Sequence, residues 1–167
     1  INYMILRYFN VCGASDNGEF GDSKKPSVHM VQNAVRETMG LEPFYLTCPQ
    51  VNTQDGTPIR DYVNIVDLNV AHLKALTLLL KGNGSNLVNL GTGKGNSVLE
   101  VIKVVQKITG SKLTINKSVS REGEYAQMVA SNNKAKKLLR WKPERSLEDS
   151  VKTLIQWYTN RPHGWEE

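Results

Sequence analysis

The sequence predicts an α/β fold, because short apolar runs alternate along the chain with segments whose apolar residues recur at helical spacing. Glycine- and asparagine-rich turns separate these runs, and Ser-x-x-Glu and Ser-x-x-Asp capping patterns open two of the helical segments. With 167 residues, 40% of them hydrophobic, the chain can bury the core of one ordinary domain, which we expect to span residues 1–167.

The chain is expected to open with a strand. Met4 to Val11 is a mostly apolar run of the kind found in strands that are buried on both faces. Asn10 lies near its carboxyl end, where open α/β sheets bind ligands. Ser27 can cap a helix that ends near Gly40, and Phe44 to Thr47 reads as a short strand.

The central stretch, from Thr53 to Leu68, combines a tight turn, a short buried strand and the start of a helix. Asp55-Gly56-Thr57-Pro58 is typical of a turn, because Gly permits positive φ and Pro fixes its own φ. Asp67 is a good N-cap for the apolar helix expected from Leu68 to Lys81. A helix that is apolar over more than half its circumference belongs against a sheet.

Arg60 is held between that turn and buried structure. A guanidinium fixed in this way can bind a phosphate or a carboxylate through two parallel hydrogen bonds. The alternative is an intramolecular ion pair with Asp61 or Asp67. This stretch by itself favours neither interpretation over the other.

A glycine-rich loop follows the next predicted strand, Leu87 to Leu90. Gly91-Thr92-Gly93-Lys94-Gly95 leads into a helix from Val98 to Thr109, which Ser97 and Glu100 open as a capping box. A strand, glycine loop and helix N-terminus can cradle a phosphate. The G-x-G-x-G spacing matches neither the dinucleotide fingerprint nor the P-loop, so we favour a structural loop packed against the sheet.

The remaining elements are a strand and two helices. The strand is expected at Leu113 to Asn116, and the helices at Asn133 to Leu139 and Leu147 to Tyr158. Ser146 and Asp149 form the second capping box.

Charge and composition exclude several classes of partner. The 21 basic and 16 acidic residues give a net charge of +5, much of it in a run from Lys134 to Arg145 that suits a solvated face. Nucleic-acid binding would need aromatic residues among these charges or a recognisable reading module, and the sequence has neither, so we expect no nucleic-acid partner. No apolar stretch is long enough to span a membrane, and we expect a cytoplasmic protein without a membrane partner.

No catalytic or metal-binding constellation is evident. Cys12 and Cys48 lack the spacing of metal ligands and are expected to be buried reduced thiols. His29, His72 and His163 share no spacing with each other or with a nucleophile. Arg121-Glu122-Gly123-Glu124 could bind a polar ligand, the arginine a phosphate and Glu124 a sugar hydroxyl, but by itself it reads as an exposed charged turn.

The order of these motifs resembles a known family. Leu6-Arg7-Tyr8-Phe9-Asn10, Asp55 to Val63, Asn89 to Gly93, Arg121 to Glu124 and Leu139 to Pro143 are together similar to the extended short-chain dehydrogenase/reductases, and within them to the UDP-glucose 4-epimerases. The resemblance spans the whole chain but only the C-terminal, UDP-sugar-binding half of such an enzyme. It implies the C-terminal strands of a Rossmann-type sheet plus a small mixed α/β substrate-binding lobe.

The resemblance also implies roles for individual residues around the phosphates. Asn10 and the helix entry at Ser27-Val28 would contact the diphosphate of a UDP-sugar, and Arg60 and Arg121 would clamp its two phosphates.

Further roles concern the base, the sugars and the cofactor. Tyr45-Leu46-Thr47 would line the uracil, and Glu124 would bond the ribose. Met128 falls where the family has a residue bordering the hexose, and Phe9 would lie against the nicotinamide end of NAD. Ser27 and Thr47 differ from the residues usual in epimerases, so the identity of the sugar stays open.

The family's chemistry needs parts that this sequence lacks. It contains neither the glycine-rich NAD fingerprint nor the Tyr-x-x-x-Lys pair whose phenolate takes the 4-hydroxyl proton. We therefore expect no catalytic residue here and no activity without an NAD-binding half. The alternatives are a fragment of a related nucleotide-sugar dehydratase or decarboxylase, a free-standing nucleotide-sugar binding module and, remotely, a basic nucleic-acid binder. An uncovered sheet edge and apolar face would favour a homodimer.

Overall fold

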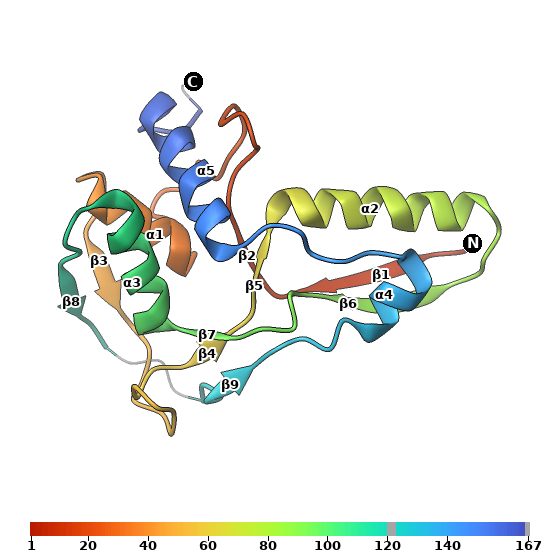
Figure 1. The fold of residues 1–167 in the computed structure, drawn as a ribbon, viewed down its shortest axis with the longest axis horizontal. Helices are drawn as coiled ribbons and strands as arrows, with labels where there is room; N and C mark the ends of the chain where they lie inside the picture. Colours follow the sequence, from red (N-terminus) through yellow and green to blue (C-terminus); the bar gives the residue numbers. More distant parts are fainter. Residues whose placement is uncertain (120–122, 166–167) are drawn as a thin grey trace.

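The computed structural model describes residues 1–119 and 123–165, with the fold drawn in Figure 1. Two parts lie side by side along the long axis of the molecule. One is built around a pair of strands that run beside the long helix α2, and the other is a cluster of helices near the C-terminus. Each part has its own cluster of buried hydrophobic side chains.

The first part is a two-stranded parallel sheet of β1 (Met4–Tyr8) and β6 (Asn86–Leu90). Helix α2 (Ile65–Leu80) and the short helix α4 (Asn133–Leu139) pack against it. α2 leads directly into β6, whereas β1 lies at the start of the chain, so the two paired strands are distant in sequence. Its core combines residues of α2, β6, α4 and the segment after α4: Leu68, Ala71, Ala75, Val88, Leu90, Leu139 and Trp141.

The second part packs three helices together: α1 (Met30–Thr38), α3 (Val98–Thr109) and α5 (Leu147–Asn160). Strand β3 (Phe44–Leu46) pairs in parallel with β8 (Ile115–Lys117) at the edge of this part. Valines fill the space between the helices, and α5 adds its large residues: Val31, Val35, Val101, Val105, Val151, Leu154 and Trp157. The mixed α/β architecture expected from the sequence is confirmed.

Short strands connect the two parts. β2 (Asn10–Cys12) pairs in parallel with β5 (Tyr62–Asn64). β4 (Ile59–Arg60) lies between β7 (Asn96–Ser97) and β9 (Gln127–Met128). The central stretch of the sequence therefore contributes strands to two different sheets.

The expected single strand from Met4 to Val11 is wrong, because the chain changes sheets at Phe9. The Phe9 N–H donates to the carbonyl of Leu90 on β6 at 3.2 Å, whereas the Asn10 N–H donates to the carbonyl of Asp61 at 3.0 Å. Burial on both faces is also wrong for β1, since Ile5 is 44% exposed. Among the described residues β1 has one neighbouring strand, so its second edge lacks a partner.

Two expected helix starts are displaced. α1 begins at Met30 with His29 as N-cap, because the Ser27 N–H bonds Glu42 and keeps that residue in the preceding loop. α2 begins at Ile65, where the Asn64 side chain accepts from the Val66 N–H at 2.8 Å. Asp67 is therefore not the N-cap, although it does lie in the first turn.

The helices with complete local caps begin where the sequence predicts. Both capping boxes, Ser97 with Glu100 and Ser146 with Asp149, are present, and α3 ends at Gly110 in the left-handed conformation. Cys12 and Cys48 are free thiols, as expected, but Cys48 is only half-buried. Burial raises the pKa of the Cys12 thiol to about 12, which keeps it protonated near neutral pH.

The fully buried carboxylate of Asp61 joins the two parts. Its Oδ1 accepts from the N–H and hydroxyl of Thr92 at 2.8 and 2.7 Å, and its Oδ2 accepts from the N–H groups of Gly93 and Ala130 at 2.9 and 3.2 Å. A Cβ on Gly91 would lie 2.7 Å from the Asp61 Oδ2 and 2.5 Å from the Ala130 Cβ. The glycine loop therefore closes tightly around this carboxylate. The structural role predicted for the loop is confirmed.

A second buried carboxylate, Asp67, anchors the segment that leads into α5. It forms an ion pair with Arg145 at 2.8 Å and accepts from the N–H groups of Glu144 and Arg145, each at 2.9 Å. Arg145 also pairs with Asp16 at 2.6 Å, and this contact holds the pKa of Asp16 below its usual value. The last member of the basic run is therefore neutralised by ion pairing.

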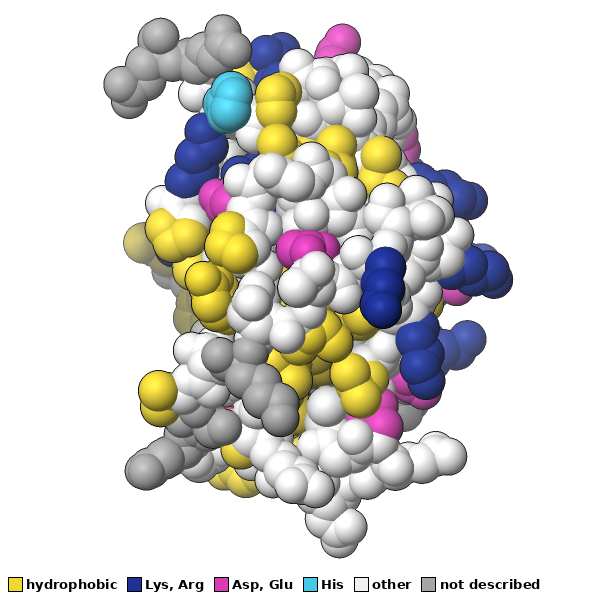
Figure 2. All heavy atoms as spheres, turned by 90° about the vertical axis from the view of Figure 1, so that its left-hand side faces the viewer, with side chains coloured by type: hydrophobic (Ala, Val, Ile, Leu, Met, Phe, Trp, Pro, Cys, Tyr) yellow, Lys and Arg dark blue, Asp and Glu magenta, His cyan; other side chains and the backbone are white. Residues whose placement is uncertain are grey.

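Both parts of the fold expose hydrophobic side chains. Viewed from the end that carries α1 and α3, hydrophobic side chains surface in patches, and Lys and Arg gather along one margin (Figure 2). On α2 the exposed hydrophobic residues are Val70, Leu73, Leu76 and Leu80.

No helix in residues 1–119 and 123–165 is long and apolar enough to cross a membrane.

We expect Asp61→Asn to lower the free energy of unfolding by about 2–4 kcal/mol, measured by urea denaturation. The amide would turn one acceptor into a donor that faces buried N–H groups. Glu144→Gln, on an exposed side chain, should change stability by less than about 0.5 kcal/mol. Equal losses in the two variants would contradict this role of Asp61.

Candidate functional site

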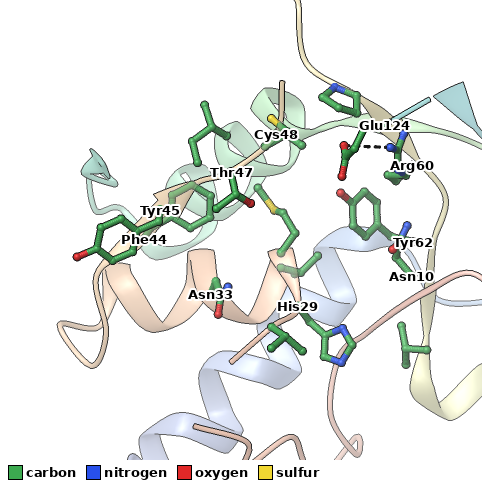
Figure 3. A pocket seen from close by; sticks show the side chains of 17 residues that line it. Asn10, His29, Asn33, Phe44, Tyr45, Thr47, Cys48, Arg60, Tyr62 and Glu124 are labelled. Carbon is green, nitrogen blue, oxygen red and sulfur yellow. Dashed lines mark hydrogen bonds and ion pairs between the residues drawn. The ribbon is translucent and has the colours of Figure 1, made fainter. Parts of the chain in front are cut away.

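Two cavities meet at Asn10, Arg60 and Glu124, which line both of them. The inner cavity, of about 170 Å³, lies between β3, the start of α1 and β5 (Figure 3). The outer cavity, of about 550 Å³, lies beside the end of β1 and β9. Both cavities lie where the two parts of the fold meet, and each has polar and apolar lining residues.

Arg60 is positioned by the backbone and by one carboxylate. Its Nη1 donates to the carbonyls of Ile59 and Tyr125, both at 2.9 Å, and its Nη2 lies 3.2 Å from the Glu124 Oε2. Of the two interpretations left open by the sequence, an ion pair with Asp61 or Asp67 is wrong, because both of those carboxylates accept from other donors. Arg60 therefore combines a fixed guanidinium with an acidic neighbour that the sequence places 64 residues away.

Asn10 is brought to the same place by the change of sheet at Phe9. Its backbone N–H and its Nδ2 both donate to the Asp61 carbonyl, at 3.0 and 3.4 Å. Its side chain is exposed at the rim that the two cavities share. The Asp61 residue that organises the glycine loop thus also positions Asn10.

The inner cavity has one wall from β3 and another from α1. Tyr45, Leu46 and Thr47 line it, as does Val28 at the entry to α1. Ser27 is 7% exposed and is not among the lining residues. The structure therefore brings most of the residues suggested for a base and a diphosphate together, with Ser27 behind the cavity wall.

The outer cavity contains the other expected residues. Phe9 and Met128 line it, beside Tyr8, Gly123 and Tyr125. Tyr8 and Met128 are 53% and 44% exposed, so this cavity opens widely to solvent. Arg121 lies outside the described residues.

Several lining residues were missed by sequence reasoning. Burial raises the pKa of Tyr62 above its ordinary value, which leaves a neutral phenol beside Arg60. Tyr62 reads in the sequence as a core residue of a strand, and Cys48 as a buried thiol. His29 was set aside because it shares no spacing with other histidines, yet its position just before α1 places it at the cavity. The lining residues with polar or ring side chains that were missed include His29, Asn33, Cys48, Pro58 and Tyr62.

The site offers hydrogen-bond donors and an ion pair rather than a metal centre or a nucleophile. No group of three or more metal-ligating side chains occurs in the part of the chain that the structure describes. The Asp55 carboxylate accepts from the Thr57 N–H at 2.9 Å and from the Ser97 hydroxyl, so the turn that presents Arg60 is held to the start of α3. Such an arrangement suits binding of a polar anionic ligand.

Comparison with known proteins identifies relatives over the whole chain. A family model described as GDP-mannose 4,6 dehydratase matches residues 1–154. The UDP-glucose 4-epimerases of Lactobacillus helveticus and Streptococcus mutans are 37% and 36% identical over 100% of this chain and 51% of each relative. The chain thus spans about half the length of these relatives.

Solved structures agree with the sequence comparison. A UDP-glucose 4-epimerase crystal structure has a TM-score of 0.93 at 35% identity, covering 100% of this chain and 51% of that one. The Bifidobacterium longum epimerase, in complex with NAD+ and UDP, has a TM-score of 0.88 at 33% identity over 97% of this chain and 49% of its own. This chain therefore belongs to the NAD-dependent epimerase and dehydratase family of extended short-chain dehydrogenase/reductases, and is similar to about half of a UDP-glucose 4-epimerase.

Proposed function

We propose that this chain forms the UDP-sugar-binding half of an NAD-dependent UDP-glucose 4-epimerase. The observation that carries the proposal is the convergence of Asn10, Arg60 and Glu124 where the two cavities meet. A guanidinium and an amide are donors for a diphosphate, and a carboxylate accepts from sugar hydroxyls. The relatives' complex with UDP supports this class of ligand.

The two cavities suit different parts of a nucleotide sugar. The inner one, walled by Tyr45, Leu46 and Thr47, is assigned to the uracil. The outer one, with Met128 at its margin, is assigned to the hexose. Val28 and the segment from Ser27 are assigned to the diphosphate side, and Arg121 to the second phosphate clamp.

The described residues fit the cofactor only at one end. Phe9 is half-buried in the outer cavity and offers a ring against which a nicotinamide can lie, and NAD would there accept and return the hydride at C4 of the hexose. The sequence contains no dinucleotide fingerprint and no Tyr-x-x-x-Lys pair. We therefore assign binding and orientation of the sugar to this chain, and most of the NAD contacts and the proton transfer to the other half.

The unpaired edge of β1 and the exposed apolar residues of α2 support association of this surface with another polypeptide. A parallel sheet of two strands is rarely stable alone, and parallel sheets are normally covered on both faces. Leu73 and Leu76 are 66% and 53% exposed on α2, which packs on β1. We propose that this surface holds the NAD-binding half in the complete enzyme and that the chain forms homodimers without it. A cytoplasmic location and no affinity for nucleic acid belong to the same proposal.

Loss of the Arg60 guanidinium should weaken ligand binding. We expect Arg60→Gln to raise the dissociation constant for UDP by about 30-fold in calorimetry, because a charge-assisted fork to phosphate is lost. Lys107→Met, which removes an exposed charge on α3, should leave the dissociation constant for UDP unchanged. If the unmodified chain gives no measurable heat with UDP or UDP-glucose at millimolar concentration, the proposal is wrong.

The chain alone should bind without turning over. We expect no interconversion of UDP-glucose and UDP-galactose with NAD present, and conversion after addition of the NAD-binding half of the Lactobacillus helveticus relative. A free-standing binding module would bind UDP-glucose but stay inactive with that half, even though the relative's own two halves regain activity together.

Leu73→Glu should disrupt association without harming the ligand site. We expect this variant to sediment as a monomer where the unmodified chain sediments as a dimer, because a charge on the exposed α2 surface opposes burial. UDP binding should be retained. A matched control is Lys107→Glu on α3, which should leave the sedimentation unchanged; a dimer that survives Leu73→Glu would place the interface elsewhere.

A further inference from the structure

A cavity of about 580 Å³ lies between the glycine loop, helix α3 and the segment that runs from α4 into α5. That segment joins the two parts of the fold in Figure 1. We call this hollow the loop cavity. It shares Tyr62 with the inner cavity of the candidate site and no other lining residue with either cavity of that site. Its volume suits a ligand of nucleotide size or smaller.

The loop cavity lies outside the surface assigned above to the NAD-binding half. β1 and α2 form that surface, and neither contributes a lining residue to the loop cavity. Apart from Tyr62, every lining residue follows β6 in the sequence. The loop cavity can therefore take a ligand of its own in the complete enzyme.

Three lysines from separate parts of the chain line the loop cavity. Lys94 belongs to the glycine loop, Lys136 to α4 and Lys142 to the segment after α4. All three side chains are exposed, and none takes part in an ion pair between described residues. Like charges gathered around one cavity repel one another, so an anion among them would be attracted and would also relieve that repulsion.

The other charged residues of the loop cavity leave this excess in place. Arg145 is neutralised by its ion pairs with Asp67 and Asp16. Glu144 and Glu148 line the cavity as well, but neither pairs with a lysine among the described residues. Two glutamates against three lysines leave the lining with an excess of positive charge.

Helix α4 strengthens the positive potential around the loop cavity. Lys134, Lys137 and the following Arg140 are also exposed. A helix of seven residues is about 10 Å long, which is close to the Debye length in 0.1 M salt, so these charges act on a ligand in the cavity. The basic run from Lys134 to Arg145 therefore borders a hollow that an anion can enter.

We propose that the loop cavity is a second binding site, which takes a small multivalent anion of the class of phosphorylated metabolites between Lys94, Lys136 and Lys142. Each ammonium group acts as a point charge on a flexible stem, so three of them can close on a ligand that carries two or more negative charges. A monovalent anion cannot engage all three lysines with comparable strength. This site goes beyond the proposed nucleotide-sugar function and does not depend on it.

The test is an NMR titration of the 15N-labelled chain with inorganic pyrophosphate as the probe. We expect saturable amide shifts in the glycine loop and in the segment from Lys142 to Ser146. Sodium acetate at the same ionic strength should give no saturating shift at these amides. Raising the salt concentration should weaken pyrophosphate binding, because the charges of exposed side chains are screened.

Two variants and one control assign the effect to the lysines. Lys94→Gln and Lys142→Gln should each weaken pyrophosphate binding at these amides about three- to fivefold, because one exposed charge contact is lost. Both positions are exposed, so the fold should be retained. Lys107→Gln, on an exposed lysine of α3 outside the loop cavity, should leave the titration unchanged.

The possible outcomes decide between a metabolite site and its alternatives. Shifts that do not saturate, or that persist unchanged in both lysine variants, would overturn the site. A short oligothymidylate that binds at the same amides more tightly than pyrophosphate would overturn the small-molecule ligand in favour of a nucleic acid. Because the readout is confined to amides of the loop cavity, neither result bears on UDP-sugar binding at Arg60.

Discussion

The buried carboxylate of Asp61 is the constraint on which the arrangement of this protein depends. It accepts four hydrogen bonds, from Thr92, Gly93 and Ala130, and so draws the glycine loop and the segment after β9 together. Its backbone carbonyl accepts from Asn10. Because Arg60 precedes it directly, the same residue fixes both donors of the candidate site relative to the sheet. These hydrogen bonds offset the cost of burying the carboxyl group inside the fold.

The parts of the fold that the sequence predicts well are those with local causes. α3 and α5 begin at capping boxes formed by residues three apart. α4 spans the residues expected for it, Asn133 to Leu139. The change of sheet at Phe9 depends on partners far away in sequence, and the Asn64 side chain that caps α2 is itself held by a hydrogen bond that its Nδ2 donates to the Ser150 hydroxyl. Leu90 and Asp61 decide the first of these, and no periodicity near Phe9 records them.

The residues of the candidate site also differ in whether the sequence could predict them. Asn10, Arg60 and Glu124 come from motifs that resemble those of a family, and the structure gathers them into one place. The pairing of Arg60 with Glu124 could not be read from the sequence, because Glu124 lies 64 residues further along the chain and comes into reach only through the pairing of β4 with β9. His29 was not predicted as a site residue, because it has no regular spacing to another histidine or to a nucleophile. Its place at the cavity depends on where α1 begins.

The two cavities meet at three residues but are otherwise built from different elements. β3, paired only with β8 among the described strands, supplies the inner wall, while β1 and β9 supply the outer one. Substitutions in Tyr45 or Thr47 can therefore reshape one chamber without disturbing Met128 in the other. On such a scaffold, substitutions can change the two cavities separately while the three shared residues stay in place. The specificity for each half of the ligand can then evolve without a change in the specificity for the other half.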